Sequence, residues 1–168
     1  MSLTDFWFYG LIGVIVAILI LWKVTKDKRN FYKAVITSFV WCWPAFIIEW
    51  YGICVIGIWY NPNITGTPPV PWSYLLLAFI GGIGLLNIFR RIYHDKTLLI
   101  FFIITAGGTG AFTIAMSILS GKWAHRFGWN PYYGFLHVVF LMTLLVVIDM
   151  LFEKYKVFDL ILRSKSGE

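Results

Sequence analysis

The stretch Phe31–Trp59 reads FYKAVITSFVWCWPAFIIEWYGICVIGIW, and its only charged side chains are Lys33 and Glu49. A membrane-spanning helix needs about 20 mainly apolar residues, with a range of about 17–25. The 29 residues of this stretch exceed one straight span, while their composition is typical of a helix surrounded by lipid. The stretch therefore predicts a membrane protein in which these 29 residues do not form one straight span.

Three residues inside the stretch determine how it can be divided. Pro44 removes a helical hydrogen bond, and Gly52 and Gly57 allow the backbone to bend. We expect one of two arrangements. Either the stretch is a single tilted and kinked helix, or a helix ends near Trp50 while Tyr51–Trp59 bends along the membrane surface.

The composition of the whole chain excludes a soluble enzyme, a disordered tail and a disulfide-rich secreted domain. Of its 168 residues, 60% are apolar and 13% are charged, whereas a soluble domain usually carries about 25% charged residues. A chain of this length cannot bury so much apolar surface in a core of its own. We predict an all-α, polytopic integral membrane protein, a single transmembrane domain over residues 1–168 with five transmembrane helices. The expected spans are residues 6–22, 31–59 (kinked or broken), 72–89, 97–119 and 135–152.

The positions of lysine and arginine predict the orientation in the membrane. Twelve of the 14 lie around residues 23–33 and 90–96 and in the tail after residue 153, whereas Lys122 and Arg126 lie on the other side. Because cytoplasmic connections carry the excess of Lys and Arg, we expect the N-terminus outside and the C-terminus cytoplasmic, in the plasma membrane. This distribution explains the net charge of +6 without a nucleic-acid partner.

The cysteines and histidines do not form a recognisable metal or disulfide pattern. Cys42 and Cys54 would lie about 18 Å apart on a straight helix, which is too far for a disulfide. A metal site would require Glu49, His125 and His137 to converge. We therefore expect no metal and no other cofactor.

Small residues spaced by four predict a close contact between two helices. Gly107 and Ala111 show this spacing in the fourth apolar segment, and Ala78 and Gly82 show it in the third. Such small faces let helices approach closely in lipid. We expect the third and fourth helices to touch through Gly82, Gly107 and Ala111; the alternative is a groove lined by glycine that holds a ligand.

Glu49 is the acidic residue that lies deepest in the apolar segments. It lies fourteen residues after Val35, about 21 Å along a helix, in the outer half of the membrane. An ionisable group at such a depth is costly and is a functional candidate by default. Glu49 could act as a general acid, or it could be a neutral hydrogen-bond donor that ties two helices. Its candidate partners are Tyr51, Trp59, Trp129 and His137.

Asp149 lies three residues from the cytoplasmic end of the last span, about 5 Å by helix rise. We expect it to anchor that end of the helix, by reaching headgroup water or the cytoplasmic Arg90 and Arg91.

Aromatic and polar side chains crowd the outer connections. They are either an interfacial aromatic belt or the lining of a pocket for an apolar ligand or a carbocation. The candidate ligand-binding residues are Trp50, Trp59, Tyr60, Asn61, Trp129, Asn130 and His137. The two outer connections also resemble each other, WYNP at 59–62 and WNPY at 129–132, which indicates either an internal duplication or coincidence.

The stretch Glu49–Pro62, EWYGICVIGIWYNP, resembles the small membrane lycopene cyclase domains, which show an acidic residue, Gly-Ile, Gly-Ile-Trp and Asn-Pro in this order. The resemblance covers about 25 of the 168 residues. It implies three-helix units used in pairs and an activity that cyclises the ends of an isoprenoid by protonating a double bond, with Glu49 as the acid. The Pro-Leu-Glu-Glu motif of that family would fall near Pro71–Tyr74, where both carboxylates are missing.

Three functions remain open. The first is a noncatalytic accessory or scaffold subunit of a larger membrane complex. The second is a membrane-embedded isoprenoid or carotenoid cyclase or isomerase with Glu49 as general acid, and a transporter or channel is the third. The expected partners are the lipid bilayer, other membrane subunits or further copies of the chain, and an apolar lipid or isoprenoid ligand. Because one carboxyl at depth is fewer polar groups than a catalytic cavity needs, the sequence favours the scaffold.

Overall fold

The computed structural model describes residues 3–24, 26–56, 59–60, 72–119, 124–125 and 130–163. These residues are helical apart from one short strand pair, which agrees with the predicted all-α class. The elements are α1 Leu3–Val24, α2 Lys28–Trp50, η1 Tyr51–Ile56, β1 Trp59–Tyr60, α3 Trp72–Ile92, α4 Lys96–Leu119, β2 Ala124–His125, α5 Pro131–Lys154 and α6 Val157–Arg163.

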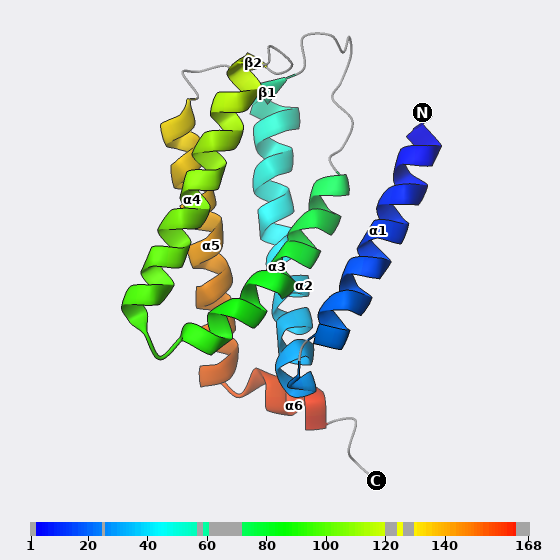
Figure 1. Ribbon diagram of the computed structural model, residues 1–168, viewed down its shortest axis with the longest axis vertical. Helices are drawn as coiled ribbons and strands as arrows, with labels where there is room; N and C mark the ends of the chain where they lie inside the picture. The colour runs from blue at the N-terminus through cyan, green and yellow to red at the C-terminus, as the bar shows by residue number, and fades with distance from the viewer. Residues whose placement is uncertain are drawn as a thin grey trace.

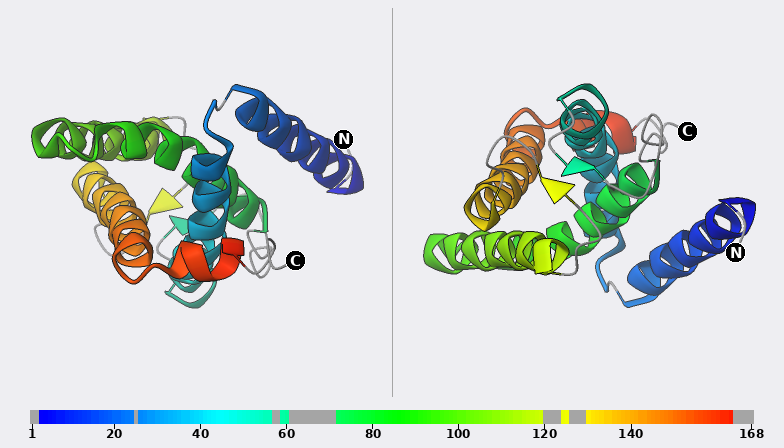
Figure 2. Two further views of the ribbon diagram at one scale, coloured as in Figure 1. Left: turned by 90° about the horizontal axis from the view of Figure 1, so that it is seen from below. Right: turned by 90° about the horizontal axis from the view of Figure 1, so that it is seen from above.

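Five long helices run up and down in alternation (Figure 1). α2 packs along α3 and α4 packs along α5, and a further contact between α2 and α5 joins the two pairs. α1 lies at the periphery in both end-on views (Figure 2), where it contacts α3. The short α6 lies across the lower end of the bundle (Figure 1), where it contacts α5.

The long second apolar segment follows neither expected arrangement completely. α2 begins after Asp27, whose carboxylate accepts hydrogen bonds from the backbone N–H groups of Arg29 at 2.9 Å and Asn30 at 3.2 Å. It ends at Trp50, as the second arrangement expected. The chain then continues as the π-helix η1 and does not bend along the surface over these residues. π-helical turns are rare and are frequent at functional sites.

Three helices of the described residues are long and apolar enough to cross a membrane: α2, residues Lys96–Met116 of α4, and α5. Large apolar side chains are exposed on each of them, for example Phe39 on α2 at 57%, Phe101 on α4 at 62% and Phe140 on α5 at 55%. Monomeric soluble proteins rarely expose apolar patches of this extent. The membrane class predicted from the sequence is therefore supported.

The prediction that Gly82 and Gly107 join the third and fourth helices was wrong, while for Ala111 it stays a prediction. Gly82 lies against α2, because a Cβ atom added there would meet Ser38 Oγ at 2.8 Å and Trp41 Cε3 at 3.3 Å. Gly107 lies against α5, where an added Cβ would meet Val139 Cγ2 at 2.5 Å. The spacing correctly marked close helix contacts, but spacing alone does not specify which helix makes them.

A further close contact brings the backbone of α4 against the backbone of α5. A Cβ atom added to Gly110 would lie 2.6 Å from the carbonyl oxygen of Gly134, and one added to Gly134 would lie 3.0 Å from the carbonyl oxygen of Gly110. Here backbone faces backbone, so neither partner can yield by rotating a side chain. This is the physical basis of small-residue contacts between membrane helices.

The apolar core lies between α2, α3 and α5. Ala34, Ala45, Ile83, Leu86 and Leu145 are all fully buried there. Leu99 of α4 also belongs to this cluster. α2 is thus the central helix of the described bundle.

The two outer connections that resemble each other in sequence meet in the structure. β1 pairs antiparallel with β2, with Trp59 opposite His125 and Tyr60 opposite Ala124. This pairing joins the end of η1 to the segment that follows α4 (Figure 1). The side chains of β1 and β2 lie outside the described part of the structure, as do Asn61 and Trp129 entirely.

Gly134 and Gly108 offer a matched pair for testing the α4–α5 contact. Gly134→Ala places a methyl group against the α4 backbone and should lower the free energy of unfolding by roughly 1–3 kcal/mol. An added Cβ at Gly108 meets nothing within 4 Å, so Gly108→Ala should be neutral or stabilise by up to about 1 kcal/mol through helix propensity. Denaturation midpoints in detergent measure both, and equal midpoints for the two variants would contradict the contact.

Candidate functional site

Glu49 and His137 form a buried pair between α2 and α5. The distance from Glu49 Oε1 to His137 Nε2 is 2.7 Å, and the two side chains are 7% and 14% exposed. His137 was among the partners expected for Glu49 from the sequence, so this part of the expectation is confirmed. The pair lies where α2 passes into η1, at the upper end of α5 in Figure 1.

The chemistry of this pair is that of a shared proton. A carboxylate can accept from a neutral imidazole N–H, and a protonated carboxyl can donate to the imidazole nitrogen. Either arrangement joins the two groups through one hydrogen bond. The same pair could deliver a proton to a substrate that came within hydrogen-bond reach, so its geometry is compatible with a structural tie and with acid–base chemistry.

The other predicted ligand-binding residues are only partly placed. Trp50 follows Glu49 and is 38% exposed, so it lies at the surface of the bundle. Asn130 caps α5, because its Oδ1 accepts from the backbone N–H of Tyr132 at 3.0 Å and of Tyr133 at 3.4 Å. Asn130 thus has a structural task, and a role in ligand binding stays a prediction for it, as it does for the rest of the set.

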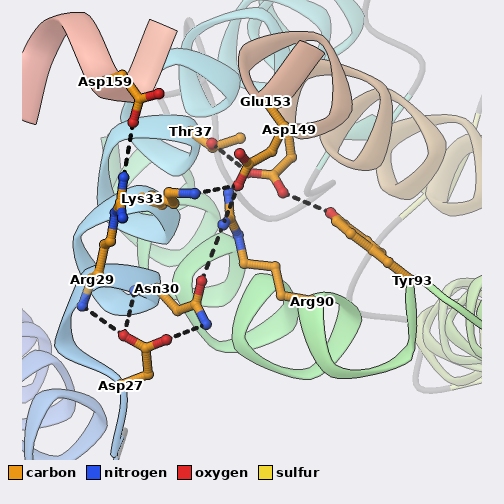
Figure 3. Close-up of polar contacts among 10 residues, drawn as sticks. All are labelled: Asp27, Arg29, Asn30, Lys33, Thr37, Arg90, Tyr93, Asp149, Glu153 and Asp159. Carbon is orange, nitrogen blue, oxygen red and sulfur yellow. Dashed lines mark hydrogen bonds and ion pairs between the residues drawn. The ribbon is translucent and has the colours of Figure 1, made fainter. Parts of the chain in front are cut away.

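A second buried carboxyl lies at the opposite end of the same two helices (Figure 3). Asp149 is fully buried. Its Oδ1 accepts from the hydroxyl of Thr37 at 2.7 Å and pairs with the guanidinium of Arg90, and its Oδ2 accepts from the hydroxyl of Tyr93 at 2.8 Å. One carboxylate therefore holds α2, α3, α5 and the turn after α3 together. Of the two arginines expected to anchor it, Arg90 does so, while Arg91 is exposed.

The phenol of Tyr93 is held in its protonated form. Burial, and then the negative charge of Asp149, raise the pKa of Tyr93 well above its ordinary value. The hydroxyl therefore stays a hydrogen-bond donor to Asp149 over the whole physiological pH range.

A second layer of charges surrounds Asp149. Glu153, one turn further along α5, accepts from Lys33 at 2.6 Å and from Arg90 at 3.0 Å. Phe158 of α6 is 2% exposed, and its ring centroid lies 5.0 Å from the Arg90 guanidinium carbon and 5.1 Å from Lys33 Nζ. These cation–π contacts let α6 cover the cluster.

Three of the four polar contacts of α2 with α5 share one antiparallel register. Lys33 of α2 pairs with Glu153 of α5. Thr37, four residues after Lys33, pairs with Asp149, four residues before Glu153. Glu49, twelve residues after Thr37, pairs with His137, twelve residues before Asp149. Between them the indole N–H of Trp41 donates to the carbonyl oxygen of Leu141 at 3.0 Å. We call these four contacts the α2–α5 seam.

Sequence reasoning singled out two of the three carboxyls of the seam, Glu49 and Asp149, but missed Thr37, Lys33 and Tyr93. A usable signal existed for two of them. Lys33 and Thr37 are four residues apart on one helix, as Asp149 and Glu153 are on another, and rows of residues four apart form the ridges by which helices pack. For Tyr93, in the turn after α3, the sequence carries no comparable signal.

No protein-family model, curated protein or solved structure matches the chain. A function is therefore inferred from the geometry of the Glu49–His137 pair and of the contacts around Asp149.

Asp149 and Asp159 provide a matched test of the contacts around Asp149. Asp149→Asn leaves the buried guanidinium of Arg90 without its main counter-charge and should cost about 3 kcal/mol or more of unfolding free energy. Asp159 pairs with Arg29 at the surface, with side chains 38% and 66% exposed, so Asp159→Asn should cost less than about 1 kcal/mol. Denaturation in detergent measures both, and a comparable loss in the two variants would show that Asp149 is not held as described.

Proposed function

We propose that the chain is a noncatalytic accessory or scaffold subunit of a larger membrane complex. The observation that carries this proposal is that both buried carboxyls bond to neighbouring elements of the same chain. Asp149 is bonded on both oxygens, and Glu49 is bonded to His137. In this proposal the polar groups fix the shape of the bundle, and its outer faces contact lipid and partner subunits or further copies of the chain.

The membrane arrangement is also part of the proposal. We place α1 to α5 as five spans, with the N-terminus outside and the C-terminus in the cytoplasm, in the plasma membrane. Two features support it. The five helices alternate in direction (Figure 1), and the Lys33, Arg90 and Glu153 cluster lies at the end of the bundle where the sequence concentrates Lys and Arg.

The second candidate function is a membrane-embedded isoprenoid cyclase or isomerase. The specific observation that favours it is the pairing of Glu49 with a second titratable group, His137, at 2.7 Å. A carboxyl and an imidazole in contact can hold and transfer a proton, and the resemblance of Glu49–Pro62 to the lycopene cyclase domains predicts such an acid. In this alternative an apolar lipid would approach from the side of η1 and Trp50.

Substitutions at Glu49 separate the two candidates. Glu49→Gln keeps the shape and one hydrogen bond to His137, but it removes the transferable proton. A scaffold should therefore fold and assemble with Gln, whereas Glu49→Leu removes the hydrogen bond between Glu49 and His137 and should cost about 1–3 kcal/mol. Unfolding in detergent and assembly state in native membranes are the two readouts. A Gln variant that folds normally but abolishes a turnover of added isoprenoid would reject the scaffold in favour of the enzyme.

Assembly itself provides a direct test of the scaffold proposal. The tagged chain, extracted from its native membranes in a mild detergent, should give a discrete species above the 19.4 kDa monomer in native mass spectrometry. The same species should persist with Glu49→Gln and be lost with Glu49→Leu. A bare monomer in both detergent and lipid nanodiscs would contradict the proposal.

The orientation can be tested by labelling single cysteines from the two sides of the membrane. In a chain in which Cys42 and Cys54 are replaced by Ala, Thr67→Cys should react with an impermeant maleimide only from outside. His94→Cys, in the connection between α3 and α4, should react only from the cytoplasm. Reaction of Thr67→Cys from the cytoplasm alone would reverse or reject the proposed topology.

A further inference from the structure

A pocket opens at the lower end of the bundle, where α1, α2 and α3 meet. Its volume is about 520 Å³, within the range of pockets that hold small molecules. It is lined by Val24, Lys26, Asp27, Asn30, Asn87, Arg90 and Arg91. Nothing in the proposed scaffold role requires such a pocket.

The lining of the pocket is basic. Lys26, Arg90 and Arg91 are the cationic lining residues and Asp27 is the one carboxylate among them, although the charge of Arg90 is already paired with Asp149 and Glu153. Asp27 is also already used, because it accepts from two backbone N–H groups at the start of α2 and from the side-chain amide of Asn30 at 2.7 Å. Its negative charge is thus partly neutralised by helix α2, and the pocket favours an anion.

Arg90 carries a donor that the fold leaves unused. Its side chain is 7% exposed, and its two terminal nitrogens are engaged by Asp149, Glu153 and Asn30. Its Nε atom is buried with no hydrogen-bond partner among the described residues. A buried donor without an acceptor costs free energy, and an anion in the pocket would become its acceptor only if the Arg90 side chain shifted, because this nitrogen is closed to solvent.

We propose that this pocket binds a phosphate group, either in the headgroup of an anionic lipid or in a soluble phosphate ester. Arg90 is the fixed part of the site because the Asp149 cluster holds it in place. Lys26 and Arg91 are exposed and line the pocket, and their positive charges would contact the ligand. Guanidinium groups bind phosphate oxygens through paired hydrogen bonds, and lysine adds a point charge. The proposal does not depend on the scaffold role.

The variants for the test avoid the residues that hold the fold. Lys26→Gln with Arg91→Gln removes two charges from the lining and leaves Arg90 and its cluster intact. The matched control, Lys96→Gln with Lys154→Gln, removes the same charge from exposed positions that do not line the pocket. Denaturation in detergent checks that both double variants are folded.

Native mass spectrometry of the full chain in detergent measures binding of phosphatidylglycerol against zwitterionic phosphatidylcholine. Parallel titrations use glycerol 1-phosphate and inorganic phosphate. Removing one lining charge should weaken phosphatidylglycerol binding about fivefold. The pocket variant should therefore bind this lipid about 25-fold more weakly than the parent chain. The control variant should bind it as the parent chain does.

The possible outcomes distinguish the sources of the phosphate. Preferential binding of phosphatidylglycerol that falls only in the pocket variant assigns the site to a lipid headgroup. The same pattern with glycerol 1-phosphate or inorganic phosphate assigns it to a soluble ligand. Selective binding of none of the three, or an equal loss in the pocket variant and the control, would overturn the proposal.

Discussion

A carboxyl group on a helix that crosses a lipid bilayer has no water to solvate it, and its hydrogen-bond partners must come from the protein. Two such groups, Glu49 on α2 and Asp149 on α5, shape this chain. Each finds its partner on the other helix, in His137 and Thr37, and both pairs belong to one antiparallel register. The seam they form fixes how far α2 can slide along α5, since a shift of either helix would break every contact at once.

The remaining elements are arranged around that seam. α3 packs on α2, and its end contributes Arg90 to the Asp149 cluster. α4 packs on α5 through the backbone contact of Gly110 with Gly134. α6 covers the cluster with Phe158. Polar contacts thus specify which helices meet, and small residues set how closely they approach, as expected where lipid removes the hydrophobic driving force between helices.

The membrane class was predictable from the sequence because it depends on composition and on the lengths of apolar runs. The pairing of Glu49 with His137 was predictable in part, because the sequence offers few polar partners near Glu49. The identity of the helix that Gly82 and Gly107 contact was not, since a small-residue pattern is the same whichever neighbour it meets. Nor were all the contacts around Asp149 and Arg90 predictable, since Tyr93 lies in the turn after α3 and Phe158 lies on the short α6, where no periodic pattern marks a buried face.

The α2–α5 seam is tested most directly by a double-mutant cycle on Glu49 and His137. Glu49→Leu and His137→Leu are made singly and together, and the free energy of unfolding of each variant is measured in the same detergent. Each single variant removes the hydrogen bond between the two side chains, and the second substitution cannot remove it again. We predict that the double variant is at least as stable as the less stable single variant. The coupling free energy between the two side chains should be about 1–3 kcal/mol. Losses that simply add, with no coupling, would show that Glu49 and His137 do not hold α2 to α5.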